Sequence, residues 1–179
     1  KTSVKHIAHM GLGASVMASV RADLADINAS LDCDVDSVSI SIQSSDLQIA
    51  NILNKDQNWV LEKIYESAVY AAEHGLYISC VAEDASRADL GFLIDFAKAA
   101  KAAGASRFGY ADSTGVEDPF TCQERIKMLR QIAGIDVEII SRNDFGMATA
   151  NTFAAINAGA RFARVTAMGI GQRAGCAPL

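Results

Sequence analysis

The sequence is short of several residue types, and each shortage narrows the classes of protein it encodes. Only two of the 179 residues are proline and half are hydrophobic, which favours a compact, helix-rich globule over a disordered chain. The formal net charge is −5, so the basic excess of a general nucleic-acid surface is missing. No apolar run approaches the roughly 18 residues that span a bilayer. We therefore expect a cytoplasmic protein that binds neither nucleic acid nor membrane.

Residues that commonly ligate metals are few and scattered. None of the three histidines stands in an H-x-H or H-E-x-x-H pattern. The cysteines form no C-x-x-C pair and lie far apart, at Cys33, Cys80, Cys122 and Cys176. This spacing predicts reduced, buried thiols rather than a zinc site or a disulfide framework. The final glycine-rich segment fails the third position of the dinucleotide fingerprint G-x-G-x-x-G, so it does not indicate a nucleotide site.

Segments with strand character alternate with helical segments along the chain. The predicted strands are 15–20, 35–42, 76–81, 107–111, 136–140 and 161–166. The predicted helices are 23–31, 54–74, 88–103, 120–132 and 148–157, with the end of another in 1–10. No two strands are close enough for a hairpin, which predicts a parallel sheet with helical crossovers. We expect a (β/α)8 TIM barrel of which about six strands are present, as one partial domain over residues 1–179.

One strand carries an unusual alternation. In VDSVSISI (35–42), apolar residues at even positions alternate with Ser37, Ser39 and Ser41. A parallel strand covered by helices on both faces reads as a nearly continuous apolar run. Small hydroxyl side chains on one face instead predict that this face lines the inside of a barrel.

In a barrel of this kind, functional residues lie at the C-terminal ends of the strands. The polar residues there are Arg21, Gln43 to Asp46, Glu83-Asp84, Asp112-Ser113, Arg142-Asn143-Asp144 and the 169–175 loop. Glu83 fits an acid/base role, or equally a salt bridge with Arg87. Ser113 fits a bond to a substrate carboxylate, although a turn with Asp112 and Gly115 is the better interpretation from position alone.

Six segments together resemble a known family. They are VDSVSISIQSSDLQI (35–49), WVLEKI (59–64), AEDASRADLGFL (82–93), YADSTGVEDPFT (110–121), NDFGMATANTFAAINAGA (143–160) and GIGQRAGCAPL (169–179). In order and spacing they are similar to the homocitrate synthase and 2-isopropylmalate synthase family, which has HMG-CoA-lyase-like TIM barrels. The nitrogen-fixation type of homocitrate synthase is the branch they resemble most.

This resemblance implies an acyltransferase that condenses acetyl-CoA with a 2-oxo acid, which is 2-oxoglutarate for homocitrate. In the family a divalent cation (Mg, Mn or Zn) holds and polarises the oxo acid. An Arg-Asp pair on the first strand, an H-x-H motif after the seventh and often an asparagine in the last loop surround that cation. Residue by residue, Glu83 falls on the family's strand-five glutamate, which implies a catalytic role, and Ser113 falls on a substrate-binding threonine and keeps its hydroxyl. Arg21 matches an arginine that often ends the third strand, which implies contact with substrate.

The metal ligands depart from the family. Ile140 and Arg142 stand where the two histidines are expected, and Cys176 replaces the loop asparagine. The two strands that would carry the Arg-Asp pair have no counterpart. No metal ligand is therefore assigned in this chain. Arg142 is instead a candidate substrate-binding residue, because a guanidinium grips a carboxylate with two hydrogen bonds.

Several functions remain open from the sequence. The first is a homocitrate-synthase-type acyltransferase, as one subunit of a split enzyme. The second is a metal-free relative that binds an anion or supports a partner subunit. A carbon–carbon lyase on the same barrel fits less well, because the last loop resembles the synthases. Six strands leave two exposed sheet edges, which predicts a homodimer, a hetero-oligomer or a longer chain.

Overall fold

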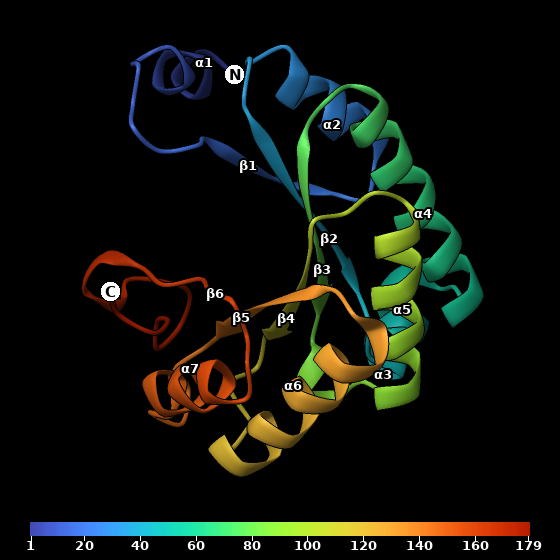
Figure 1. The fold of residues 1–179 in the computed structure, drawn as a ribbon, viewed down its shortest axis with the longest axis vertical. Coiled ribbons are helices and arrows are strands. Elements are labelled where there is room, and N and C mark those ends of the chain that lie inside the picture. The colour runs from blue at the N-terminus through green and yellow to red at the C-terminus, as the bar shows by residue number, and fades with distance from the viewer.

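The computed structural model covers residues 1–179, and its strands form one parallel sheet (Figure 1). The strands are β1 (Met17–Arg21), β2 (Ser37–Gln43), β3 (Tyr77–Glu83), β4 (Arg107–Asp112), β5 (Asp136–Ser141) and β6 (Phe162–Ala163). They lie side by side in chain order, and every neighbouring pair is parallel. This order is that of a (β/α)8 barrel that stops two strands short of closure. The predicted partial barrel is confirmed.

All the helices except the first, which precedes β1 and has no buried residue, connect the strands and cover one face of the sheet. They are α1 (Thr2–Ala8), α2 (Leu24–Leu31), α3 (Asp46–Gln48), α4 (Gln57–Glu73), α5 (Leu90–Ala102), α6 (Pro119–Ala133) and α7 (Ala148–Asn157). Shorter turns are the π-helical η1 (Ile49–Leu53) and the 3-10 turns η2 (Ala85–Arg87) and η3 (Ala167–Gly169). In Figure 1, α2, α4 and α5 lie on one side of the sheet and the C-terminal segment lies on the other. None of these helices combines the length and the apolar character needed to cross a membrane.

Aspartates fix where four of the helices begin. Asp23, Asp56, Asp89 and Asp118 each accept a hydrogen bond from a backbone N–H of the first turn. Such caps satisfy donors that the helix itself leaves unpaired. The cap at Asp56 explains why α4 begins at Gln57 and not at residue 54 as predicted, since Asn54 has a left-handed backbone with φ of 53°.

The main core lies between the sheet and the helices. The even positions of β2, Val38, Ile40 and Ile42, belong to this buried cluster, whereas Ser39 on the opposite face accepts a bond from Arg164. Ser19, Ser39 and Ser79 are neighbours in β1, β2 and β3. The predicted serine-lined inner face is therefore confirmed.

Two local features differ from the sequence prediction. Strand β6 is shorter than residues 161–166, because only Phe162 and Ala163 pair with β5. Its other edge has no partner strand to extend it. The turn η1 lies between the predicted strand 35–42 and the predicted helix 54–74, where the sequence predicts no regular element. All four cysteines are buried, in agreement with the predicted buried thiols.

Gly109 on β4 marks a close approach inside the barrel. A Cβ at this position would lie 2.7 Å from Val81 Cγ2 and 3.3 Å from Val81 Cα. We expect Gly109→Ala to lower the free energy of unfolding by about 1–3 kcal/mol through overpacking. Urea unfolding measures this loss, and Gly13→Ala is the matched control, because nothing lies within 4 Å of a Cβ there. If the two variants lose the same free energy of unfolding, β4 can move away from Val81 without cost and the prediction is wrong.

Candidate functional site

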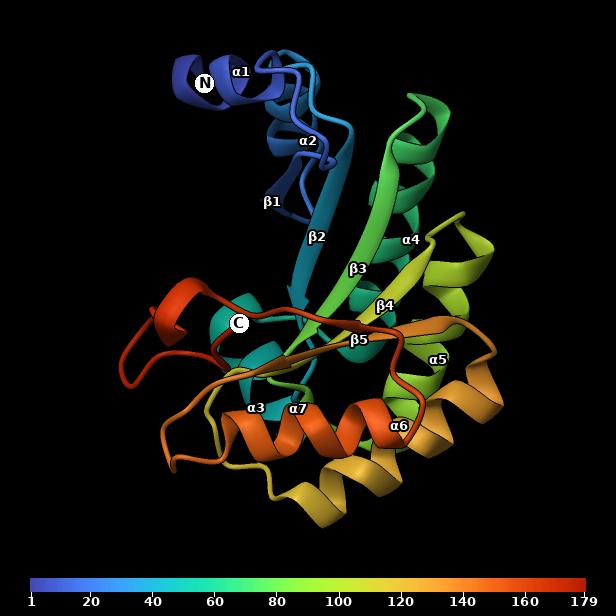
Figure 2. The ribbon, with the colours of Figure 1, turned by 60° about the vertical axis from the view of Figure 1, so that its left-hand side comes forward.

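A small cavity lies at the C-terminal ends of the strands, on the inner face of the sheet. Its volume is about 180 Å³, and its lining comprises Ser19, Glu83, Ala111, Ser113, Ile140, Arg142, Arg164, Thr166 and Cys176. Figure 2 shows the C-terminal segment passing over β5 near the place where β3, β4 and β5 converge. Glu83, Ser113 and Arg142, three of the four predicted site residues, therefore meet in one cavity. We call it the mouth pocket.

Glu83 and Ser113 meet because one ends β3 and the other directly follows β4, its neighbour in the sheet. The Ser113 hydroxyl donates to Glu83 Oε2 at 2.5 Å and accepts the Asp84 backbone N–H at 2.9 Å. Arg87 forms its ion pair with Asp84 at 2.7 Å, not with Glu83. Glu83 is thus oriented by a hydroxyl and not neutralised by a neighbouring cation, which suits a group that exchanges protons. Glu83 is also the only carboxylate in the lining.

Arg142 lies against the last loop. Residues Arg142 and Cys176 form an isolated antiparallel bridge, and Arg142 Nη1 donates to Cys176 Sγ at 2.9 Å. Ile140, two residues earlier on the same face, joins Val81 and Ala111 in a small apolar floor. The positions of the family's histidines are therefore occupied by a side chain without donors and by a fixed positive charge.

The residues present do not fit the divalent metal that the family resemblance implies. No group of three or more His, Cys, Asp or Glu side chains is placed to hold an ion. Cys176 alone offers a soft thiolate, which is a poor ligand for Mg²⁺ or Mn²⁺, and it lies beside a guanidinium.

Beneath the mouth pocket, one carboxylate holds two guanidiniums. Glu138 is 4% exposed and accepts bonds from Arg164 Nε at 3.2 Å and Nη2 at 3.1 Å. Arg107 Nε lies 3.4 Å from the same carboxylate, and its guanidinium stacks on the rings of Tyr77 and Phe162. Ser79 donates to Glu138 at 2.9 Å. We call Glu138, Arg107 and Arg164 the inner ion cluster.

Sequence reasoning missed Arg164. Its Nη2 also donates to Ser39 at 2.8 Å, which fixes the guanidinium across the inner face. The spacing of Phe162, Arg164 and Thr166 could have indicated it, because alternate residues of a strand lie on the same face of the sheet. Thr166 Oγ1 also lines the mouth pocket and is buried without a hydrogen-bond partner.

Arg21 is not brought to the mouth pocket. It ends the edge strand β1, and its side chain is 80% exposed. Its Nε and Nη2 donate to the two oxygens of Asp26 at 2.7 and 2.9 Å. Its substrate-binding role stays a prediction, because this bidentate pair holds the guanidinium away from the other three predicted residues.

A second buried carboxyl lies behind the loops that carry Glu83 and Ser113. Tyr110 donates to Glu117, and Arg125 Nε donates to the Tyr110 oxygen at 2.9 Å. Arg125 Nη2 also donates to the backbone oxygens of Ala85 and Ala88. Burial raises the pKa of Glu117 to about 7, against an opposing effect of the Tyr110 bond and the Arg125 charge.

This pKa predicts a pH-dependent stability. Since the pKa in the folded state exceeds the 4.5 of an unperturbed glutamate, Glu117 favours folding below pH 4.5, and this contribution is lost as the pH rises through about 7. As the pH rises from 5 to 8, we expect the free energy of unfolding of Glu117→Gln to increase by about 1–3 kcal/mol relative to that of the unchanged chain. Urea unfolding across this range measures it, with the exposed Glu124→Gln on α6 as control. A difference between variant and unchanged chain that is constant with pH would contradict the prediction.

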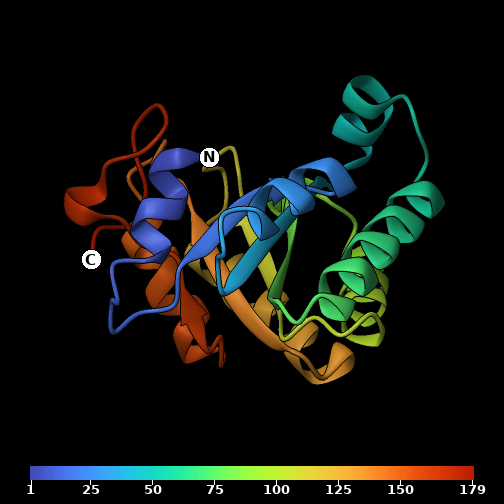
Figure 3. The same ribbon diagram turned by 90° about the horizontal axis from the view of Figure 1, so that it is seen from above.

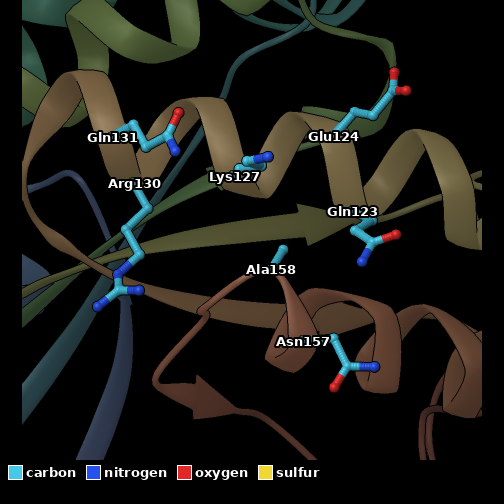
Figure 4. Close-up of a pocket in the computed structure, with 7 residues that line it drawn as sticks. All are labelled: Gln123, Glu124, Lys127, Arg130, Gln131, Asn157 and Ala158. Carbon is cyan, nitrogen blue, oxygen red and sulfur yellow. The ribbon is translucent and has the colours of Figure 1, made fainter.

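A larger cleft of about 430 Å³ lies outside the barrel (Figure 4). Its walls come from α6 and the end of α7, and its lining is Gln123, Glu124, Lys127, Arg130, Gln131, Asn157 and Ala158. It contains none of the predicted site residues. The mouth pocket, where an acid, hydroxyls and two guanidiniums converge, is therefore the candidate functional site.

A comparison with models of protein families identifies the family of the chain. The model of the HMGL-like family matches residues 1–179. The chain belongs to the HMGL-like family.

Relatives within this family are synthases by name. The 2-isopropylmalate synthase 2 of Caldanaerobacter subterraneus subsp. tengcongensis is 48% identical over 179 residues, which are all of this chain and 47% of that protein. The homocitrate synthase subunit alpha of Clostridium pasteurianum is 45% identical over 175 residues, or 98% of this chain and 65% of that protein. The (R)-citramalate synthase of Methanocaldococcus jannaschii is 41% identical over 179 residues, or 36% of that protein. The chain spans less than two thirds of each of these relatives.

Solved structures agree on the fold. The HMG-CoA lyase of Bacillus subtilis superposes with a TM-score of 0.86 at 16% identity, over 98% of this chain and 64% of the lyase. The lyase from Brucella melitensis gives 0.82 at 15% identity, over 97% and 64%. At such identities the likeness shows a shared barrel and nothing about the reaction. The predicted HMG-CoA-lyase-like barrel and the resemblance to the synthase family are confirmed.

Proposed function

We propose that the chain is a partial-barrel domain of an acyltransferase that condenses acetyl-CoA with a 2-oxo acid in the cytoplasm, with 2-oxoglutarate as the first candidate. The observation that carries the proposal is identity of 48% and 45% to proteins named synthases, extending over nearly the whole chain. The HMGL-like chain also keeps a carboxylate at its mouth, Glu83, in hydrogen-bonding contact with Ser113.

The reaction requires groups that the mouth pocket supplies. A base removes a proton from the acetyl methyl group, the resulting carbanion attacks the 2-oxo carbon, and the new alkoxide takes up a proton. Hydrolysis of the thioester then releases free CoA. Glu83 is the proton-transferring group in this proposal, and Ser113 orients it at 2.5 Å. Arg142 holds the negative charge of the oxo acid or alkoxide by charge-assisted hydrogen bonds.

A partner subunit is part of the proposal. The edge strands β1 and β6 each lack a neighbour on one side, so backbone groups of the sheet are left unpaired. One relative is itself named a subunit alpha, and 98% of this chain aligns with it. We propose that the chain works as one subunit of a split enzyme, in a homodimer or hetero-oligomer that covers these edges.

The test is release of free CoA thiol from acetyl-CoA, measured with 2-oxoglutarate, 2-oxoisovalerate and pyruvate in turn. The chain is assayed alone and together with a polypeptide that supplies two further barrel strands. Glu83→Gln should lower kcat about a hundredfold, whereas the exposed Glu124→Gln should leave it unchanged. No CoA release with any oxo acid, alone or in the complex, contradicts the acyltransferase proposal.

A second candidate is a metal-free relative that binds an anion or serves as a structural partner subunit. Ile140, Arg142 and Cys176 favour it, because they replace the ligands that the family uses for its cation. A complex whose activity survives both Glu83→Gln and Arg142→Gln, but is lost without this chain, would support the structural role.

A further inference from the structure

The mouth pocket carries a positive charge in an acidic protein. The formal net charge of the chain is −5. The lining of the mouth pocket and the inner ion cluster together hold three guanidiniums, of Arg107, Arg142 and Arg164, and two carboxylates, of Glu83 and Glu138, while the neighbouring Asp144 is paired with Arg173. One positive charge is thus uncompensated where field lines concentrate between low-dielectric walls. An anion is the ligand that this charge attracts.

Two guanidiniums in the lining keep unused donors. Arg142 makes one hydrogen bond within the chain, from Nη1 to Cys176, so Nε and Nη2 are free. Arg164 uses Nε and Nη2 on Glu138 and Ser39, so Nη1 is free. The buried Thr166 hydroxyl also has no partner. A buried hydroxyl without a partner is costly, and the free donors of the two half-buried guanidiniums suit a ligand carboxylate.

Size and floor of the pocket restrict the ligand further. A volume of about 180 Å³ is smaller than the roughly 300–1,000 Å³ of sites for drug-sized ligands, so it can enclose a small acid but not a whole coenzyme molecule. The apolar floor of Val81, Ala111 and Ile140 is only one wall. It suits a short carbon chain with polar groups at both ends, rather than a branched apolar side chain.

We propose that the mouth pocket binds a small dicarboxylate directly, one carboxylate on Arg142 and the other on Arg164, and that Arg164 sets the preference for two carboxylates over one. This rests on the proposed function, because it takes the same pocket as the substrate site. The pair of guanidiniums replaces the cation in holding the ligand. Arg164 is a specificity-determining residue, positioned by Glu138 and Ser39.

The experiment compares two acids that differ in one group. 2-Oxoglutarate and 2-oxopentanoate have the same carbon chain, but only the first has a second carboxylate. Calorimetric titration of the 179-residue chain in EDTA should show that 2-oxoglutarate binds about tenfold to a hundredfold more tightly. Arg164→Gln should abolish this preference and leave the affinity for 2-oxopentanoate unchanged, whereas Arg142→Gln should weaken both acids. Arg161→Gln, an exposed arginine paired with Asp136, is the matched control and should change neither affinity.

Four results of this titration overturn the inference. These are equal binding of the two acids, no binding of either, a preference that survives Arg164→Gln, or binding that requires added Mn²⁺. If Arg164→Gln does not fold, Arg164→Lys is the substitute variant. It keeps the ion pair with Glu138 but cannot bind a carboxylate with two parallel hydrogen bonds. An undiminished preference for 2-oxoglutarate in that variant would count against the inference. Binding without CoA release would contradict the proposed reaction and leave the inference standing. CoA release with equal binding of both acids would contradict only the inference.

Discussion

Glu138→Ala is expected to lower the free energy of unfolding by about 3–5 kcal/mol, the loss typical of a broken buried ion pair. Glu138 is 4% exposed and is the only carboxylate against the guanidiniums of Arg107 and Arg164. Its removal leaves two positive charges on the inner face without compensation. Since small domains are stable by only about 5–15 kcal/mol, such a loss approaches unfolding.

Urea unfolding of matched variants separates the charge effect from simple truncation. Asp136→Ala lies two residues earlier on β5 and breaks an ion pair with Arg161, which is 71% exposed, so it should cost less than about 1 kcal/mol. The triple variant Glu138→Leu/Arg107→Met/Arg164→Met removes the whole inner ion cluster and should regain much of the loss, because no charge stays unpaired. If the triple variant is as unstable as Glu138→Ala, packing and not charge explains the loss.

The double variant Ile140→His/Arg142→His is expected to bind one equivalent of Zn²⁺ with a dissociation constant of about 10 µM or tighter. Alternate residues of a strand project on one face, so both imidazoles would enter the mouth pocket. The 2.9 Å contact between Arg142 and Cys176 shows that residue 142 is adjacent to a thiol. Two imidazoles, one thiolate and an open position are a donor set that suits zinc.

Elemental analysis after dialysis measures this gain of metal. The unchanged chain and the matched variant Ile140→Leu/Arg142→Gln should hold no stoichiometric metal. Adding Cys176→Ala to the histidine variant should weaken zinc binding about tenfold or more, because one ligand is lost. A stoichiometric metal in the unchanged chain, lost in Arg142→Ala, would show that the mouth pocket holds an ion despite its donor set.

The alternation of strands and helices, and of serine with apolar residues in β2, was enough to predict the barrel. These patterns are local, and burial on one face enforces them. The turn η1 and the short β6 were not predictable in this way. The length of β6 depends on whether another strand pairs with its far edge, and residues 161–166 alone do not determine this.

The site was predicted as far as strand ends determine it. Glu83 ends β3 and Ser113 directly follows β4, and these strands are neighbours in the sheet, so their contact follows from the order of strands. Arg164 was missed because its role depends on Glu138 of the adjacent strand. Arg21 ends a strand as well, but a nearby carboxylate, Asp26, takes both of its donors. Competition between a site and a local ion pair is decided by side-chain geometry that spacing does not contain.

The serines and arginines on the inner face also bear on how stability varies with temperature. Ser19, Ser39, Ser79 and the inner ion cluster stand where barrels usually stack valine, isoleucine and leucine. Exposing apolar surface on unfolding raises the heat capacity, whereas exposing polar surface lowers it. The increase in heat capacity on unfolding, per residue, should therefore be smaller for this chain than for a barrel with an aliphatic interior. Its stability curve is correspondingly broad, and cooling weakens the fold less.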